Sequence, residues 1–99
     1  MCAHADTTTE HASEKARALV KGAVDLHVHV APDVMDRITD DLTLATQYGE
    51  AGIDGFVLKS HYVPTAERAS VVNKAVPGAR AIGAITLNAA VGGMNAMAV

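Results

Sequence analysis

The sequence has few aromatic side chains and almost no cysteine. Aromatic residues make up 3% of its 99 residues, and tryptophan is absent. Alanine and valine supply much of the 49% apolar fraction, so a core built from them buries little area per residue. Cys2 is the only cysteine, which excludes an internal disulfide and favours a reducing compartment. The first twenty residues lack the apolar run of a secretory signal, and we therefore expect a cytoplasmic protein.

Clusters of basic residues are also missing. The chain carries 8 Lys and Arg residues against 11 Asp and Glu residues, a formal charge of −3, which argues against a nucleic-acid partner. Residues 81–99 carry no charge, and their length is close to the minimum for a membrane span. Glycines and asparagines interrupt this stretch, so a buried strand followed by a glycine loop is the preferred interpretation, and no membrane partner is expected.

Segments with strand and helix patterns alternate along the chain. Strands recur about every thirty residues with a helix between each pair, which is typical of βαβ units and a parallel sheet. We expect strands at residues 23–29, 53–59 and 80–87, and helices at 7–21, 40–51, 65–75 and from about Asn95 onward.

The predicted fold class is α/β, as the first three βα units of a TIM-type (β/α) barrel with parallel strands. Residues 1–21 form an N-terminal tail and helix in this interpretation, and residues 22–99 form the partial barrel. A closed barrel of eight strands takes roughly 200 residues or more. We therefore expect a chain that is truncated after the third strand.

The strongest local signal is the segment Asp25-Leu26-His27-Val28-His29. Side chains alternate along a strand, so Asp25, His27 and His29 are expected on one face. Two imidazoles at positions i and i+2 lie close enough to share a divalent cation, and Asp25 would orient them or bind the metal itself. The alternative is a polar strand face with two ordinary histidines.

Polar groups also follow the next two expected strands. Lys59-Ser60-His61 ends the second strand and Asn88 ends the third, at the edge where parallel α/β folds place their sites. For His61 the alternative is a structural histidine. For Lys59 it is a solvated side chain or one that binds a substrate anion.

Residues 24–29 and 52–61 resemble the amidohydrolase-type metal hydrolases, and especially the polymerase-and-histidinol-phosphatase type. Both have a His-x-His motif after the first strand, and the phosphatase type has a metal-binding histidine after the second. The chain is also similar to an uncharacterised bacterial amidohydrolase-like family with Lys-Ser-His at that place and a later Leu-Asn…Gly-Gly-x-Asn segment. The resemblance covers residues 22–99, which correspond to the opening third of the family's barrel.

This resemblance implies that His27 and His29 bind a divalent metal ion, zinc or manganese, and that His61 is a further ligand. Lys59 and Ser60 stand where the phosphatase type has threonine and aspartate, so we expect a different metal shell. The implied chemistry is attack by a metal-activated water on an amide, ester or phosphoester of a small-molecule substrate. The general base would come from later strands, so these 99 residues alone are expected to be inactive.

The loops leave other interpretations open. Asp33 would reach the metal or substrate, or cap its own turn after Pro32. Asn88 would contact substrate, and the glycine loop at Gly92 and Gly93 would either hold an anion on its backbone N–H groups or form a tight turn.

Two alternatives to the hydrolase remain open. One is a small α/β module that binds phosphate or nucleotide and whose histidines are structural, and the other is a gene fragment without a function of its own. In any of these cases, exposed strand edges on a partial barrel predict self-association into a homo-oligomer.

Overall fold

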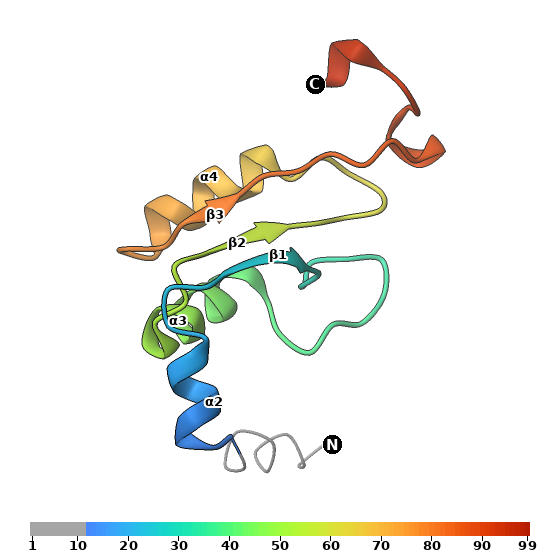
Figure 1. Cartoon of the computed structure of the whole chain (residues 1–99). Coiled ribbons are helices and arrows are strands. Elements are labelled where there is room, and N and C mark those ends of the chain that lie inside the picture. The colour runs from blue at the N-terminus through green and yellow to red at the C-terminus, as the bar shows by residue number, and fades with distance from the viewer. Residues whose placement is uncertain (1–11) are drawn as a thin grey trace.

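The alternating pattern produces a three-stranded parallel sheet in the computed structural model, which describes residues 12–99 (Figure 1). Its elements are α2 (Glu14–Leu19), β1 (Val24–Val28), α3 (Asp41–Ala51), β2 (Gly55–Leu58), α4 (Ala66–Ala75), β3 (Ala81–Ile82) and two 3₁₀ helices, Ala89–Val91 and Ala96–Ala98. The strand order is β1-β2-β3, and both strand pairs are parallel. The α/β class and the parallel sheet are therefore confirmed, whereas the barrel stays a prediction.

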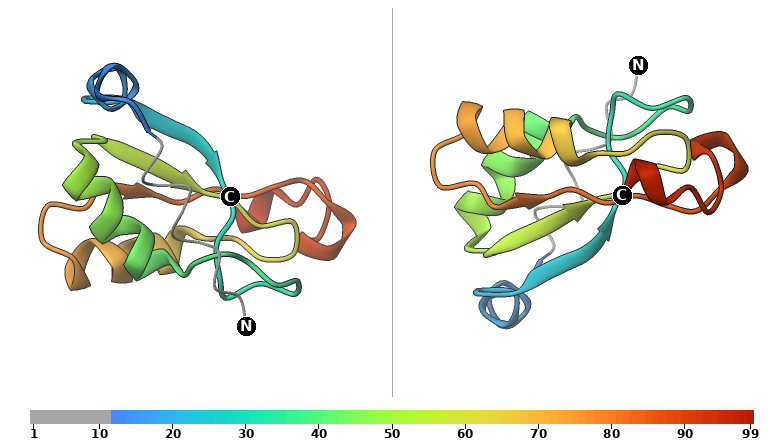
Figure 2. Two further views of the ribbon diagram at one scale, coloured as in Figure 1. Left: turned by 90° about the horizontal axis from the view of Figure 1, so that it is seen from below. Right: turned by 90° about the horizontal axis from the view of Figure 1, so that it is seen from above.

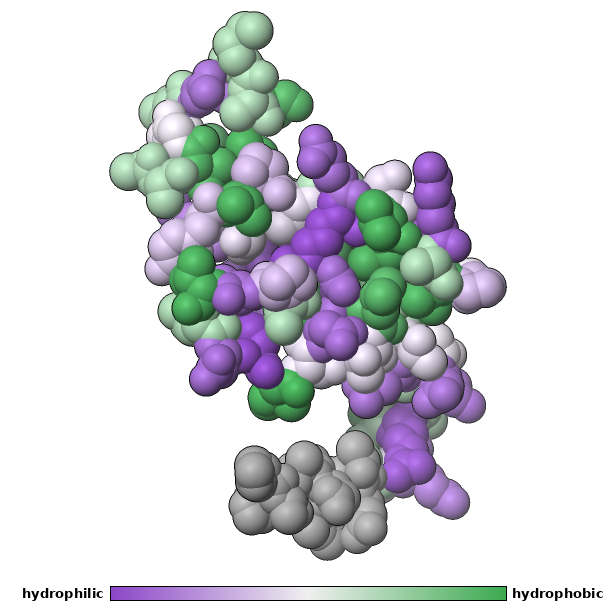
Figure 3. Space-filling view, turned by 180° about the vertical axis from the view of Figure 1, so that it is seen from behind, coloured by the Kyte–Doolittle hydropathy of each residue, from purple (hydrophilic) through white to green (hydrophobic). Residues whose placement is uncertain are grey.

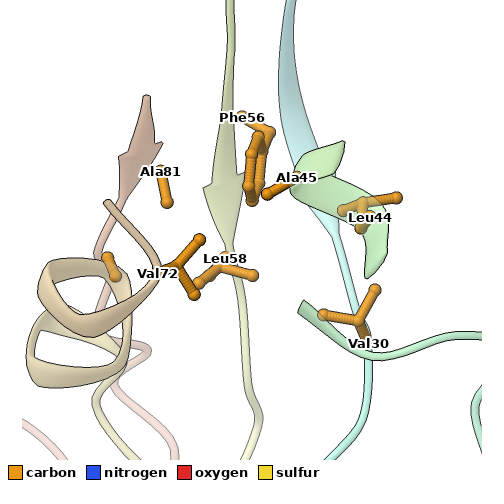
Figure 4. Close-up of a cluster of buried hydrophobic side chains, with 8 residues drawn as sticks. Val30, Leu44, Ala45, Phe56, Leu58, Val72 and Ala81 are labelled. Atoms are coloured by element: carbon orange, nitrogen blue, oxygen red, sulfur yellow. The ribbon is translucent and has the colours of Figure 1, made fainter. Parts of the chain in front are cut away.

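Helices α3 and α4 lie on the same side of the sheet, as both views of Figure 2 show. The core lies between them and β2, whose Phe56 and Leu58 are almost completely buried (Figure 4). The remaining core residues are Val30, Leu44, Ala45, Ala69, Val72 and Ala81. On the strands, Leu26 and Ile82 remain 69% and 44% exposed, so the sheet has one covered face and one open face.

The ends of α3 follow from its sequence. The Asp40 carboxylate accepts a hydrogen bond of 2.7 Å from the Thr43 N–H and caps the first turn, as predicted. Gly52 ends the helix with a φ of 79°, a left-handed conformation that glycine adopts without strain.

Helix α2 begins later than its sequence pattern predicts. Ser13 caps it by accepting a hydrogen bond of 3.1 Å from the Ala16 N–H, so the first helical residue is Glu14. Residues 7–11 of the expected helix lie outside the described residues.

Strand β3 is much shorter than the eight residues expected at 80–87, because Ala84, beyond its end, forms its hydrogen bonds with Thr65 and not with β2. Thr65 is completely buried. Its backbone N–H donates to the Ala84 carbonyl at 3.0 Å, and its hydroxyl accepts from the Ala84 N–H at 2.8 Å. The same hydroxyl donates to the Leu58 carbonyl at 2.6 Å. Thr65 thus joins the carboxyl end of β2 to the chain beyond β3.

Gly83 allows this close approach. A Cβ atom at this position would lie 2.3 Å from the Cα of Ala66, at the start of α4. No real Cβ contact is that short, so only glycine fits between β3 and the helix.

The segment after Asn88 contains two short turns in place of the fourth helix expected near Asn95. Each 3₁₀ helix has three residues, and the Asn95 side chain caps the second by accepting from the Met97 N–H at 3.1 Å. Met94, Met97 and Val99 are each at least 88% exposed, and this segment forms the apolar top of Figure 3. Across residues 12–99, no helix has the length and apolar character needed to cross a bilayer.

Candidate metal centre

A bulge in β1 decides where the predicted site residues point. Asp25 pairs with Phe56, but the next registered pair is Val28 with Leu58, so β1 uses one residue more than β2 over this interval. The His27 N–H is donated at 3.0 Å to the carboxylate of Asp25. The structure therefore differs from the regular alternation expected over residues 25–29.

Asp25 lies on the α3 side of the sheet, where the bulge separates it from the histidines. Its Oδ2 accepts a hydrogen bond of 2.6 Å from the Tyr48 hydroxyl of α3. Burial, and then this contact, raises the pKa of Tyr48 to about 12. Tyr48 also packs edge-on against Phe56, with ring centroids 5.5 Å apart. Both Asp25 oxygens are engaged, so this carboxylate joins β1 to α3, and it makes no hydrogen bond to an imidazole among residues 12–99.

His27 and His29 converge as the sequence predicts. Their Nε2 atoms lie 3.2 Å apart, and their rings are tilted by 55°. Two nitrogens bound to one tetrahedral zinc at 2.0–2.1 Å are separated by about 3.3 Å. The pair therefore has the spacing of two ligands of one cation, and equally that of an N–H···N hydrogen bond between neutral rings.

The surroundings of His29 favour its neutral form, which is the form that binds metal ions. Burial is the main cause that lowers its pKa from the ordinary 6.5, and the nearby charge of Arg37 is the next. Its Nδ1 is buried and has no hydrogen-bond partner among residues 12–99. Because Nδ1 is buried, Nε2, which faces His27, is the nitrogen that is available to a cation, and ligation needs this nitrogen unprotonated.

His61 reaches the pair from the loop after β2. Its ring stacks on His29 with centroids 4.9 Å apart and an angle of 17° between the planes. Asn88 orients it, because its Nδ2 donates to the His61 carbonyl at 3.1 Å and lies 3.3 Å from Nδ1. This stacking leaves His61 beside the pair, and within residues 12–99 no three His, Cys, Asp or Glu side chains are arranged to hold a metal ion.

Asp33 binds within its own loop. Its Oδ2 accepts from the Arg37 Nε at 2.7 Å, and its Oδ1 accepts from the Val34 N–H at 2.7 Å. The Arg37 hydrogen bond is the largest cause that holds the pKa of Asp33 below its usual range. This geometry supports the capping role for Asp33, and it places the Arg37 charge near His29.

Arg68 anchors the start of this loop, although the sequence contains no local signal for such a role. From α4, its Nε donates to Asp41 at 2.6 Å. Its Nη atoms donate to the backbone carbonyls of Val30, Ala31 and Pro32. The chain directly after His29 is therefore tied to two helices.

Lys59 and Ser60 take different roles at the end of β2. The Lys59 N–H donates to the Val28 carbonyl at 2.9 Å, and its half-buried side chain has no hydrogen bond or ion pair with the described residues. The Ser60 hydroxyl is buried and accepts from the N–H groups of Tyr62 and Val63, so it shapes the turn that carries His61.

The N–H groups of the glycine loop donate to carbonyls within the same loop. The Gly92 N–H donates to the Ala89 carbonyl at 3.0 Å, and the Gly93 N–H donates to the Asn88 carbonyl at 2.9 Å. Both glycines have positive φ angles. The loop therefore fits the tight-turn interpretation, and these donors are not open to an anion.

Together these contacts define a small α/β protein with a histidine pair at the carboxyl edge of a parallel sheet. Its sequence belongs to a family of unknown function, DUF6282, whose model matches residues 22–99. The match starts at Gly22, two residues before β1. No curated protein and no solved structure matches the chain, so the relationship to amidohydrolases stays a prediction.

Proposed function

We propose that His27 and His29 bind a divalent cation, zinc or manganese, in a metal-dependent hydrolase of the amidohydrolase type. The observation that carries this proposal is the 3.2 Å separation of their Nε2 atoms at the carboxyl end of β1, in a parallel sheet. In this proposal the sheet corresponds to the first three βα units of a (β/α) barrel, and its open face is the side toward the barrel interior.

The three histidines have different roles in this proposal, because their surroundings differ. His27 is exposed and presents its Nε2 to an incoming ion, while the half-buried surroundings of His29 lower its pKa and so favour the neutral ring that coordinates. His61 would supply a third nitrogen once its ring left the stack on His29, and Asn88 would keep it close by holding its backbone carbonyl. A bound cation would polarise the scissile group and lower the pKa of its water.

Neither Asp25 nor Asp33, the two carboxylates considered for this site, is free to act as a general base. Asp25 is bound by Tyr48, and Asp33 is bound by Arg37. We therefore expect these 99 residues to bind the cation without turning over an amide, ester or phosphoester substrate.

Metal affinity tests the proposal directly. The chain is stripped with a chelator and titrated with zinc or manganese by calorimetry, and the stoichiometry is checked by elemental analysis. We expect one equivalent of metal, and a loss of affinity of about 100-fold for His27→Ala or His29→Ala, because each removes one ligand. His61→Ala is expected to cost less, since its ring must first leave the stack.

The matched control changes two histidines elsewhere in the sequence. A chain with His4→Ala and His11→Ala has a similar loss of imidazole and should keep the affinity of the unaltered chain. If the His27→Ala, His29→Ala double variant bound metal as well as this control, the histidine pair would not be a metal site.

A further inference from the structure

Arg37 and Arg68 each form an ion pair of the same kind with an aspartate, but their other contacts differ. Each donates its Nε to an aspartate, Arg37 to Asp33 at 2.7 Å and Arg68 to Asp41 at 2.6 Å. Arg68 also donates both Nη groups to backbone carbonyls. The two Nη groups of Arg37 have no hydrogen-bond partner among residues 12–99.

The Arg37 guanidinium is held in place before any ligand arrives. Asp33, whose side chain is only 5% exposed, fixes the guanidinium at Nε, and the Val34 N–H fixes Asp33 in turn. Arg68 anchors the beginning of the loop, and a bridge between Ala31 and Asp40 closes it. A guanidinium positioned in this way loses little side-chain entropy when it binds a ligand.

The loop that carries Arg37 follows His29 directly and lies beyond the carboxyl end of β1 (Figure 1). The Arg37 side chain is 21% exposed, and its Nη donors are not among the buried groups that lack a partner, so solvent reaches them. Its charge acts on the His29 ring. Two parallel N–H donors on a rigid planar group match the geometry of a carboxylate or a phosphate.

We propose that Arg37 binds an oxyanion group of the substrate, a carboxylate or a phosphate, beside His27 and His29. This role rests on the proposed function, because it assumes that the substrate's reacting group meets the cation held by the histidines. Asp33 is then a positioning residue that directs the guanidinium, and Arg68 is one that anchors the loop.

The test uses the chain in excess chelator, so that binding of the oxyanion is measured without any metal. Inorganic phosphate and propionate are titrated separately, and the readout is the nitrogen-15 signal of the Arg37 Nε–H together with the dissociation constant. We expect the Arg37 signal to move and saturate with one of the two probes, which identifies the substrate group. Arg37→Gln should weaken that probe about tenfold or more, and Arg37→Lys should recover part of the loss.

Arg80 provides the matched control. It also pairs with an aspartate, Asp54, but through Nη1 and with both side chains more than half exposed. Arg80→Gln should leave the binding of either probe unchanged. The proposal is wrong if neither probe moves the Arg37 signal, or if Arg37→Gln binds the probe as well as Arg80→Gln does.

The direct signal of Arg37 in the unaltered chain decides the question even if Arg37→Gln does not fold. The outcome also separates this proposal from the metal site. Metal binding without an effect of Arg37 on the probes would remove only the oxyanion role. Probe binding that depends on Arg37 in a chain that binds no metal would remove only the metal site.

Discussion

Replacement of Arg68 by alanine should destabilise the protein and loosen the loop that follows His29. The side chains of Arg68 and Asp41 are 18% and 13% exposed, so their ion pair is mostly shielded from water. The substitution leaves the Asp41 carboxylate without its guanidinium and three backbone carbonyls, those of residues 30–32, without their donor. Hydrogen bonds to charged groups contribute about 1.5–3 kcal/mol each, but water replaces part of this loss at a partly exposed site. We therefore expect a decrease of about 2–4 kcal/mol in the free energy of unfolding.

Urea unfolding followed by circular dichroism measures this change. A domain of this size has a stability of roughly 5–10 kcal/mol, so the loss is a large part of the total. Arg80→Ala is the control, because its ion pair with Asp54 is more than half exposed and should contribute no more than about 1 kcal/mol. Hydrogen exchange should also accelerate at the Ala31 N–H, which donates to Thr39 within the loop. If Arg68→Ala costs no more than Arg80→Ala, the reasoning about this anchor is refuted.

Two further predictions concern the ends of the strands. Thr65→Val should lower the free energy of unfolding by about 2–3 kcal/mol, because the Leu58 carbonyl and the Ala84 N–H lose their buried partner. Thr46→Val, whose exposed hydroxyl donates only to Leu42, should change it by no more than about 0.5 kcal/mol in the same urea titration, and equal effects would contradict the bridging role of Thr65. The pKa of His29 is below 6.5 in the folded chain, so at lower pH the unfolded chain binds a proton more readily than the folded chain does. The free energy of unfolding should therefore fall as the pH drops from 6.5 toward the pKa of His29 in the folded chain. Urea midpoints of the chelator-treated chain at several pH values should show this slope, and His29→Gln should flatten it; an identical slope in the variant would count against the shift.

The sequence by itself identified most of the elements that build the sheet. Helices α3 and α4 lie within a residue of the expected ranges, and the strands fall inside theirs. Caps such as Asp40, stops such as Gly52 and continuous apolar runs such as residues 56–58 are local signals, so they are readable without any knowledge of the fold. The convergence of His27 and His29 was predictable for the same reason, because it depends on two residues only two positions apart at the end of one strand.

The tertiary structure decided how these parts meet. The bulge that turns Asp25 toward Tyr48 arises from the pairing of β1 with β2 and from a contact between residues 23 positions apart. The short β3 results from Thr65, which pairs with Ala84 across 19 positions, and the anchored loop results from Arg68, which reaches back 36 to 38 positions. Residue patterns report which side of an element is apolar, whereas the partner of a polar side chain is set only when separate elements pack together. Nothing in the sequence separates Arg37 from Arg68. Their contacts in the fold make Arg68 a structural anchor and leave Arg37, in our proposal, free to donate hydrogen bonds to an oxyanion.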